Sequence, residues 1–348
     1  MVKLGRREVV GIDIGSHSVK VIQLRRTHKG WSVRAGAVVE IGDKGSDSPG
    51  KKEANTISAI LTSLRLAGIK THHAVCSLGG HDVSIRNFDF PVLPDDELEM
   101  AVLLEARQVC HFSTIDIAVD YNIVGNSKER SKGYLVATTN RLLKNRTKII
   151  KKAKLNCVLM DVDALALLNC FAEIENSEKD HRTAVLNIGN NHTTMVIEGN
   201  EGWPFVRNLN YAGNEVIKQI AEDNDITIEE VRKNLIEGTE EQQAEIHNSL
   251  TRTSERLASD IEKTLLYYST QENSFDIENI LVCGGFSQFD NLVEFLNNRL
   301  PVNVRIWNPF EKMRCHGGHK HRGILLKNII KKNGPAMTIA AGLAMRAI

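Results

Sequence analysis

The sequence predicts an α/β protein of two lobes with a cleft between them, and three observations carry this prediction. The chain has 348 residues, beyond the roughly 250–300 residues at which a single hydrophobic core stops growing. A strand, a polar turn with a glycine and a returning strand occur twice, at residues 10–18 and 186–194. A third glycine turn, Gly284-Gly285, follows a short buried strand. Two such hairpins are able to face each other across a cleft.

The composition is that of an ordinary cytoplasmic globular protein. Hydrophobic residues make up 42% and charged residues 25% of the chain, which argues against disorder or a fibrous protein. With 44 basic and 43 acidic residues, no overall field favours nucleic acid or an anionic membrane. The 6 cysteines lie far apart without a CxxC pair, as expected for reduced thiols. The N-terminus lacks a signal peptide pattern and no run of about 18 apolar residues occurs.

The first part of the chain predicts an antiparallel meander, a helix and a further strand. Apolar or alternating runs that are typical of strands lie at residues 9–14, 18–24, 31–41 and 73–78. The Gly- and Ser-containing stretch 42–55 predicts a loop. The helix is then expected at 56–67, because Gly68 supplies a stop signal.

A separate strand and helix unit is predicted next. Its strands are expected at 83–90, 117–124 and 133–138, and its helices at 95–110 and 140–153. Pro91 ends the first strand, Asp95 and Asp96 offer an N-cap for the first helix, and the second helix has a basic outer face. A strand at 157–162 and a helix at 164–171 follow, before a polar linker at 173–182.

The second half repeats the opening of the chain. Strands are predicted at 183–188, 193–198, 280–283 and 302–306, and helices at 213–222, 227–235, 240–268, 289–299 and from Pro335 to the C-terminus. Pro335 suits the first turn of a helix because its missing N–H would be unpaired there in any case. Glu229 and Glu230 lie in the first turn of the helix that starts at 227, where acidic side chains are favourable.

The two hairpins have the chemistry of a phosphate site. Gly15 and Gly189 permit a positive φ and a close approach of backbone to ligand, and the turn amides and Ser or Thr hydroxyls offer hydrogen-bond donors. Asp13 faces the first turn, where a carboxylate can hold Mg²⁺ directly or through water, and Lys20 adds a positive charge. Each hairpin taken alone is equally well read as an ordinary β-turn. The third glycine turn makes it much harder to interpret all three elements as ordinary turns.

In this order and spacing the three elements resemble the phosphate-1, phosphate-2 and adenosine motifs of the actin, hexokinase and heat-shock-chaperone superfamily. Lys20 falls where actin has its phosphate-contacting lysine. The resemblance implies an α/β, two-lobed actin-like (ribonuclease H-like) ATPase fold that binds ATP with Mg²⁺ in the cleft.

Within that superfamily both lobes resemble the PilM family of type IV pilus assembly proteins, with FtsA as the nearest relative. The similar segments are 11–16, 90–97, 105–121, 161–164, 213–214, 308–310 and 335–344. The resemblance implies five segments: 1–82, the first-lobe core; 83–154, an FtsA-like inserted subdomain; 155–180, the connecting helix; 181–334, the second lobe; and 335–348, a helix returning to the first lobe. It also implies a cytoplasmic protein, peripheral to the inner membrane, whose partner is the cytoplasmic tail of a PilN-like protein.

The chain departs from the family pattern at the metal. Asn187 stands where the family usually has aspartate, and Asp163-Ala164 stands where relatives often have Glu-Pro. Asp13 and Asp163 are therefore the candidate catalytic residues. Both are also expected to bind Mg²⁺ through water. An amide cannot act as a general base, so we expect nucleotide binding with little or no hydrolysis.

The residues expected to contact nucleotide come from all three motifs. They are Gly15, Ser16, His17, Ser18, Lys20, Asn187, Gly189, Asn190, Asn191, Thr193, Thr194, Gly213, Gly284, Gly285, Phe286 and Ser287, with Asp260 and Lys263 as weaker candidates for ribose or base contacts. Small residues are usual where Phe286 stands, so its ring packs either near the base or away from it.

Three other features have competing interpretations. The loop from Cys315 to His321 carries ligand-type residues, but its spacing matches no standard zinc site and favours a solvated loop. The basic run from Lys320 to Lys332 fits an acidic lipid or partner, although a solvated face is the simpler reading. The Ala- and Gly-rich C-terminal helix favours a packed position under the nucleotide over a membrane anchor.

The sequence leaves three functions open. The first is an assembly scaffold that grips an extended peptide from an inner-membrane protein. The second is an active ATPase or small-molecule kinase, for which Asp163 is the candidate base and Asn187 counts against turnover. The third is an FtsA-like filament, with self-association. No nucleic-acid partner is expected.

Overall fold

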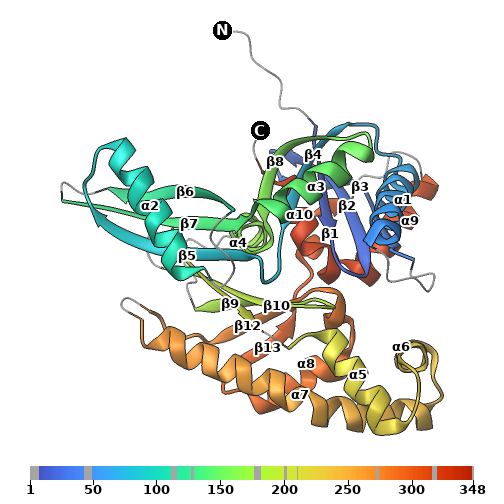
Figure 1. Ribbon diagram of the computed structural model, residues 1–348. Helices are drawn as coiled ribbons and strands as arrows, with labels where there is room; N and C mark the ends of the chain where they lie inside the picture. The colour runs from blue at the N-terminus through green and yellow to red at the C-terminus, as the bar shows by residue number, and fades with distance from the viewer. Residues whose placement is uncertain are drawn as a thin grey trace.

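The computed structural model describes residues 8–42, 49–110, 116–126, 129–175, 182–199, 202–209, 211–271, 274–315 and 320–346. Two α/β lobes and a smaller sheet beside them make up the molecule (Figure 1). The first lobe lies at the upper right of Figure 1, the second lobe below it, and the smaller sheet at the left.

The first lobe is built on a six-stranded sheet in the order β14-β3-β2-β1-β4-β8. Its strands are β1 (Val10–Ile14), β2 (Ser18–Thr27), β3 (Gly30–Glu40), β4 (His73–Leu78), β8 (Asn156–Val162) and β14 (Arg314–Cys315). The first three are antiparallel neighbours, whereas β4 and β8 run parallel to β1. The predicted meander is thus confirmed.

The second lobe repeats this arrangement in the order β11-β10-β9-β12-β13. Its strands are β9 (Thr183–Ile188), β10 (Thr193–Glu198), β11 (Pro204–Leu209), β12 (Asn279–Cys283) and β13 (Asn303–Ile306). Strand order and direction match those of β3-β2-β1-β4-β8, with an antiparallel meander followed by two parallel strands. The repeat that the two hairpins predict therefore extends over five strands in each lobe.

Helices cover both faces of the first sheet, because its strands are apolar on both sides. The helices are α1 (Pro49–Ala67), α3 (Asn140–Lys152), α4 (Asp163–Glu175), α9 (Lys320–Asn333) and α10 (Thr338–Ala344). Residues of α1 and α3 share one core cluster with Val10 and Ile12. Residues of α4, α9 and α10 share another with Ile22 and Val33, on the other face.

The C-terminal helix α10 lies inside the first lobe, and all of its residues are buried. A Cβ added at Gly342 would lie 1.8 Å from the carbonyl oxygen of Ala166 on α4, and one added at Gly11 would lie 2.2 Å from that of Ala340. Small residues thus let α10 contact α4 and β1 backbone to backbone. The packed position predicted for this helix is confirmed.

The remaining helices form the outer layer of the second lobe. They are α5 (Gly213–Asn224), α6 (Ile228–Glu237), α7 (Glu240–Ser269) and α8 (Asp290–Arg299), with short 3₁₀ turns at Gly285–Gln288, Pro309–Lys312 and Pro335–Met337. Leu257 and Ile261 of α7 are buried with Ile217 of α5 and Leu292 of α8 in the core of this lobe.

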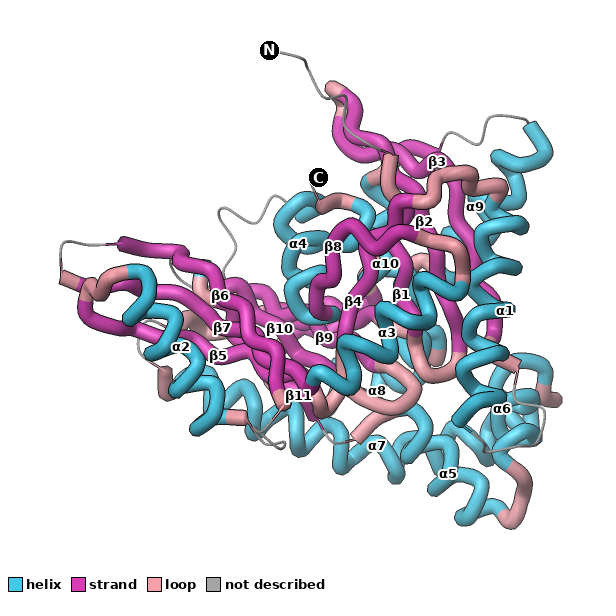
Figure 2. Tube along the Cα trace, turned by 45° about the horizontal axis from the view of Figure 1, so that its top comes forward, coloured by secondary structure: helices cyan, strands magenta, loops and turns pink. Residues whose placement is uncertain are grey.

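A third, antiparallel sheet follows β4 in the chain, in the order β5-β7-β6. It comprises β5 (Val83–Pro91), β6 (Ile117–Asn126) and β7 (Arg130–Thr139), covered by α2 (Asp95–Val109). Phe88, Leu135 and Val102 contribute to a core of its own. Figure 2 shows this sheet reaching away from the first lobe alongside β9, β10 and β11.

Three elements differ from expectation. Helix α1 begins at Pro49 and not at Thr56, because proline is well tolerated in a first turn and the Gly and Ser content suggested a longer loop. No strand was predicted at β11, and no helix at α9, which forms over the basic run. His316 to His319 of the Cys- and His-containing loop lie outside the described residues. Over the described ranges, no helix is both long and apolar enough to cross a membrane.

Candidate functional site

The first hairpin holds a buried ion pair. Asp13 and Lys20 are cross-strand partners on β1 and β2, so their side chains point to the same face. Lys20 Nζ lies 3.0 Å from Asp13 Oδ2, with the two side chains 12% and 8% exposed. Burial raises the pKa of the Asp13 carboxyl, and the charge of Lys20 opposes that rise. The hairpin therefore presents a cation and an anion together beneath its turn.

Close contact, and not backbone conformation, requires glycine in the two turns. Neither Gly15 nor Gly189 adopts the positive φ that glycine permits. A Cβ at Gly15 would instead lie 2.8 Å from Lys20 Nζ, and one at Gly189 would lie 2.7 Å from the carbonyl oxygen of His192. The turns close with hydrogen bonds from the Gly15 amide to Ser18 O and from the Gly189 amide to His192 O, both 3.1 Å long.

The second hairpin is tied to the start of α5. The amide of Gly213 donates to Gly189 O at 3.0 Å, and the amide of Asn214 donates to Asn190 O at 2.7 Å. These bonds satisfy amide groups that every helix leaves unpaired at its first turn. Gly213, which the sequence analysis places among the nucleotide contacts, therefore lies beside the second hairpin.

The two hairpins meet across the interface between the lobes. Asn190 Nδ2 donates to Ser16 Oγ at 3.4 Å, joining residues 174 positions apart. Asn208 Nδ2 donates to the carbonyl oxygen of Gly80 at 3.4 Å, from β11 to the first lobe. Asn187, Thr194 and Asn208 are cross-strand neighbours on one face of the second sheet, and Thr194 Oγ1 donates to Asn208 Oδ1 at 3.0 Å.

Asp163 lies in the first turn of α4 and joins this group. Its carboxylate rests against Gly79, where an added Cβ would lie 1.9 Å from Oδ2. His192 Nε2 lies 3.8 Å from the same oxygen, and Asp163 raises the pKa of His192 despite burial. The negative charge of Asp163 also contributes to the raised pKa of Asp13. The structure thus brings both predicted carboxylates into one electrostatic cluster.

Three residues of this cluster were missed from the sequence. His192 was placed in the turn without a role, yet it links the second hairpin to Asp163. Arg146 of α3 donates to the carbonyl oxygen of Ile14 at 3.1 Å, and Arg232 of α6 donates to Asn190 Oδ1 at 2.9 Å. The basic face of α3 gave a signal for Arg146, whereas nothing in the sequence singles out Arg232 from other surface cations.

The remaining residues of the two hairpins lie at the edge of the cluster. His17 lies 3.8 Å from Glu40 and is about half exposed. Burial and the charge of Arg232 lower its pKa. Ser18 begins β2, and Asn191 accepts a hydrogen bond from Asn190 Nδ2 at 2.6 Å.

The third glycine turn closes against the second hairpin. Gly284 has a φ of 95°, and a Cβ there would lie 2.4 Å from the carbonyl oxygen of Ile188, so glycine is required on both grounds. Its amide donates to Pro335 O at 2.9 Å. Gly285, by contrast, has no neighbour within 4 Å of an added Cβ.

Phe286 and Ser287 turn into the protein. The Phe286 ring lies against Gly213, where an added Cβ would be 2.3 Å from the ring, and it meets Phe289 edge-on with centroids 4.8 Å apart. Ser287 Oγ donates to Gly284 O at 2.8 Å and is fully buried. Phe286 is therefore a core residue that touches the backbone beside the second hairpin.

Asp260 and Lys263 do not join the cluster. They lie 3.8 Å from each other on α7. Among the described residues, no hydrogen bond or ion pair connects either of them to the hairpins. Helix α7 meets the end of β11 elsewhere, where Tyr211 Oη donates to the carbonyl oxygen of Thr253 and Arg256 lies over the Tyr211 ring.

A groove of about 850 Å³ adjoins the cluster. It is lined by the β4–β5 connection and the first half of β5, by the start of α4, by β11, and by Tyr267 and Gln271 at the end of α7. Asp163 and Thr194 belong to both the groove and the hairpin cluster. β5 and β11 are each the outer strand of their sheets, so two sheet edges border the same groove.

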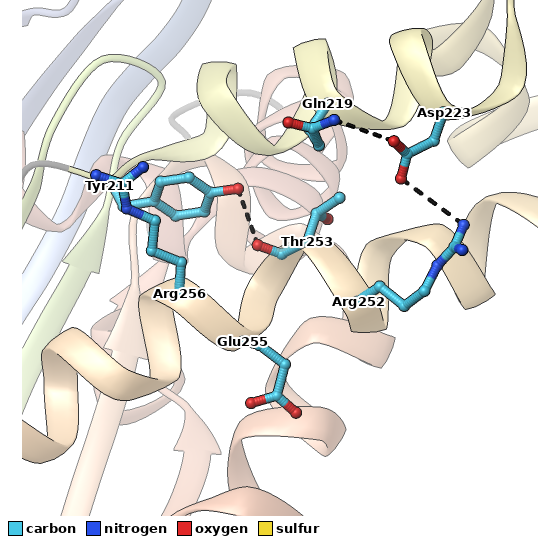
Figure 3. A pocket seen from close by; sticks show the side chains of 7 residues that line it. All are labelled: Tyr211, Gln219, Asp223, Arg252, Thr253, Glu255 and Arg256. Carbon is cyan, nitrogen blue, oxygen red and sulfur yellow. Dashed lines mark hydrogen bonds and ion pairs between the residues drawn. The ribbon is translucent and has the colours of Figure 1, made fainter.

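A second hollow of about 450 Å³ lies over α5 and α7. Several of the residues that line it interact with one another (Figure 3). Gln219 donates to Asp223 at 3.0 Å, and Arg252 lies 3.7 Å from Asp223. This hollow contains none of the predicted nucleotide residues.

The cluster suits a phosphate chain better than a bare metal ion. Three cations, Lys20, Arg146 and Arg232, lie beside the two turns, whose glycines bring the backbone close to its neighbours. Among the described residues, no group of three or more His, Cys, Asp or Glu is placed to hold a metal. Mg²⁺ commonly uses one or two carboxylates, water and substrate phosphates, so Asp13 and Asp163 fit that smaller role.

Comparisons with known proteins agree with this geometry. The family model described as type IV pilus assembly protein PilM matches residues 11–348. A solved PilM-PilN type IV pilus biogenesis complex is similar over 98% of both chains, with 23% identity and a TM-score of 0.80. The ethanolamine utilization protein EutJ from Carboxydothermus hydrogenoformans is similar over 98% of this chain and 90% of its own, with 13% identity and a TM-score of 0.58. Component A of (R)-2-hydroxyglutaryl-CoA dehydratase from Acidaminococcus fermentans is similar over 97% of this chain and 96% of its own, with 11% identity and a TM-score of 0.51.

Proposed function

The chain belongs to the type IV pilus assembly protein PilM family and has the two-lobed actin-like ATPase fold, and from this we propose that it is a nucleotide-binding scaffold of pilus assembly. It binds ATP between the lobes and the cytoplasmic N-terminal tail of a PilN-like inner-membrane protein. Through that tail it is held at the inner membrane from the cytoplasmic side.

The observation that carries the nucleotide part is the meeting of the two hairpins. The Asn190–Ser16 hydrogen bond places both turns side by side, with the carboxylates of Asp13 and Asp163 in the same cluster. The turn amides, Lys20, Arg146 and Arg232 would bind the phosphates, as successive N–H groups and cations do in other anion sites. Asp13 and Asp163 would hold Mg²⁺ through water, and the ion would neutralise phosphate charge.

Slow turnover follows from the residues around Asp163. A general base must accept a proton at the atom that faces the attacking group, and Asn187 cannot do so. His192 Nε2 lies 3.8 Å from Asp163 Oδ2, and this contact restrains the orientation of the carboxylate. We therefore expect ATP hydrolysis slower than about one turnover per second, the lower end of ordinary enzymes.

The tail is proposed to lie in the groove between β5 and β11. Outer strands present backbone N–H and C=O groups that an extended peptide can pair with. Phe205, Arg207 and Tyr267 line one wall, with the Arg207 guanidinium 5.5 Å from the centre of the Tyr267 ring. Because Asp163 and Thr194 border this groove, a bound nucleotide would influence the shape of its floor.

Titration with a synthetic N-terminal tail of a PilN-like protein tests the partner part. We expect binding to the wild type, and a loss of about tenfold or more for the Arg207→Ala, Tyr267→Ala double variant, because central aromatic and Arg contacts dominate such interfaces. The exposed α2 variant Leu104→Ser is the matched control and should bind normally. Equal affinity of all three proteins would contradict the groove assignment, and no heat with any of them would contradict the partner.

An active ATPase or kinase is the alternative function for the same cleft. One variant distinguishes this alternative from the scaffold. Asn187→Asp restores the acid that the family usually has opposite Asp13. We expect it to raise the rate of ATP hydrolysis well above that of the wild type, because a carboxylate both holds Mg²⁺ and accepts protons. A wild-type rate of tens of turnovers per second would contradict the scaffold.

A further inference from the structure

The charge of the chain is unevenly distributed. No Asp or Glu occurs after Glu311, whereas 8 of the 44 Lys and Arg residues do. The residues up to Glu311 therefore contain 36 basic against 43 acidic side chains, although the whole chain is nearly neutral. Lys312 and Arg346 pair with Glu175 and Asp161, so the other six cations, on β14 and α9, form the positive region that the overall net charge conceals.

Helix α9 carries much of this positive charge on its outer face. Leu326 and Ile330 are buried against the first-lobe sheet, and an added Cβ at Gly36 of β3 would lie 3.6 Å from Leu326. Because a helix repeats every 3.6 residues, the opposite face presents Lys327, Lys331 and Lys332, all exposed. Arg314, on the neighbouring strand β14, is exposed as well.

Two large aliphatic side chains are exposed on the same helix. Ile324 and Leu325 are 58% and 61% exposed. Ile324 lies three and seven residues before Lys327 and Lys331, which places the three side chains on one side of the helix. The outer face of α9 thus combines bulky apolar groups with lysines, and no acidic residue belongs to the helix.

Two other exposed surfaces, on α2 and α3, lack this combination. The exposed pair Met100 and Leu104 on α2 is accompanied by Glu99 and Glu105 on the same helix. Helix α3 is rich in lysine, but two of its lysines, Lys148 and Lys152, already pair with Glu53. None of the large exposed hydrophobic side chains lies on α3.

We propose that the outer face of α9, formed by Ile324, Leu325, Lys327, Lys331 and Lys332, is a contact surface for a bilayer that contains anionic phospholipids. The lysines meet the headgroups while the two aliphatic side chains enter the boundary with the acyl chains. A purely acidic peptide would match the lysines but leave the aliphatic pair in water. Single-stranded nucleic acid is bound largely through aromatic stacking and Arg, which this face lacks. The proposal is independent of the nucleotide and of the PilN-like tail.

Vesicle co-sedimentation of the full chain tests the proposal. The vesicles contain either phosphatidylcholine alone or a mixture of phosphatidylcholine and phosphatidylglycerol, without nucleotide or peptide. We expect binding to the mixed vesicles that weakens with added salt, since the Debye length shortens, and little binding to phosphatidylcholine. Lys327→Ala, Lys331→Ala, Lys332→Ala should lose about fivefold in affinity for each lysine, as about 1 kcal/mol per Lys implies. Ile324→Ser, Leu325→Ser should also weaken binding, by about tenfold.

Two matched controls make the result specific to α9. Arg141→Ala, Lys144→Ala, Lys151→Ala removes three exposed cations from α3, and Met100→Ser, Leu104→Ser removes the exposed pair from α2. Both should bind mixed vesicles as the wild type does. The proposal is overturned if the wild type does not bind these vesicles, if the α3 control loses as much as the α9 variant, or if the aliphatic variant keeps full affinity. It is overturned as well if polyglutamate or DNA binds through α9 while vesicles do not.

Discussion

At the scale of single residues, the pair Asp13–Lys20 anchors the first hairpin. Both side chains are nearly buried and lie 3.0 Å apart. A buried charge is tolerated mainly because its partner is present. Removal of one partner alone would therefore leave an uncompensated charge in the first lobe.

Replacement of one partner should expose this dependence. We expect Lys20→Met to lower the free energy of unfolding by about 3 kcal/mol, because it leaves the Asp13 carboxylate buried without its cation. Asp13→Asn added to Lys20→Met should recover most of that loss. Urea denaturation measures both, and a double variant no more stable than the single one would contradict the explanation.

The cysteine thiols differ in burial and in their neighbours, and their reactivity should differ accordingly. Burial raises the pKa of Cys283 to about 12 and raises that of Cys170 well above its usual value. A hydrogen bond from Cys76 lowers the pKa of the partly exposed Cys157. Since the thiolate is the reactive form, Cys157 should react first with a thiol reagent near neutral pH.

Labelling with a chromogenic disulfide reagent checks this order. Cys157→Ser should remove the fastest phase, whereas Cys283→Ser should leave it unchanged. The fast phase should also grow as the pH rises toward the pKa of Cys157, because more thiolate is then present. A fast phase that survives Cys157→Ser would show that another thiol is the reactive one.

At the scale of elements, the crossing of α10 and α4 depends on Gly342. An added Cβ would lie 1.8 Å from the backbone oxygen of Ala166, and Asn169 Nδ2 donates to Gly342 O at 2.7 Å across the same contact. Backbone atoms cannot move aside as a flexible side chain can. The helices must therefore separate if the residue is enlarged.

Gly342→Ala should destabilise the protein by about 3 kcal/mol, at the upper end of overpacking effects. Gly50→Ala is the control, because nothing lies within 4 Å of its added Cβ at the start of α1. That change should be neutral or slightly stabilising, since alanine favours helix. Thermal unfolding compares the two, and similar midpoints would contradict the close crossing.

The predictability of elements followed the strength of their local pattern. β9 and β10 were predicted at their observed bounds because two runs rich in Val, Ile, Leu and Thr flank a polar turn. The start of α1 was missed because Gly50 and the preceding residues have loop composition, whereas the core contact of Ile60 holds the whole helix in place. Helix α9 was missed because its lysine-rich outer face concealed the buried pair Leu326 and Ile330.

The candidate site was predictable where chemistry is concentrated in short motifs. Asp13 and Lys20 lie beside Gly15, and Asn187 lies beside Gly284. His192, Arg146 and Arg232 enter from a turn and two helices that only the folded chain brings together. Such long-range neighbours leave no spacing signal in one sequence.

At the scale of the whole molecule, a few polar contacts join the lobes beside the hairpins. Asn190–Ser16, Asn208–Gly80 and His192–Asp163 all cross the interface near the proposed phosphate position. A ligand that contacts both hairpins would add to these contacts and stabilise the closed arrangement. Nucleotide binding and lobe closure should accordingly be linked.

This linkage predicts that nucleotide raises the thermal midpoint of the whole protein. A ligand that binds only the folded state stabilises it by about 2.7 kcal/mol at a hundredfold excess over its Kd. Asn190→Ala, which removes the contacts with Ser16 and Arg232, should reduce the shift produced by MgATP. Differential scanning calorimetry with and without MgATP measures the shift, and an unchanged shift in this variant would contradict the role of Asn190.

The most direct test of the account is titration of MgATP into the wild type and two variants. Asp13→Asn removes the carboxylate at the centre of the hairpin cluster, and Asp260→Asn removes one on α7 that no hydrogen bond or ion pair among the described residues connects to the cluster. We expect measurable binding of MgATP by the wild type. The affinity of Asp13→Asn should be lower by about tenfold or more, because the metal loses a carboxylate. The affinity of Asp260→Asn should be unchanged. Unchanged binding by Asp13→Asn, or a larger loss in Asp260→Asn, would contradict the assignment of the two hairpins as the nucleotide site.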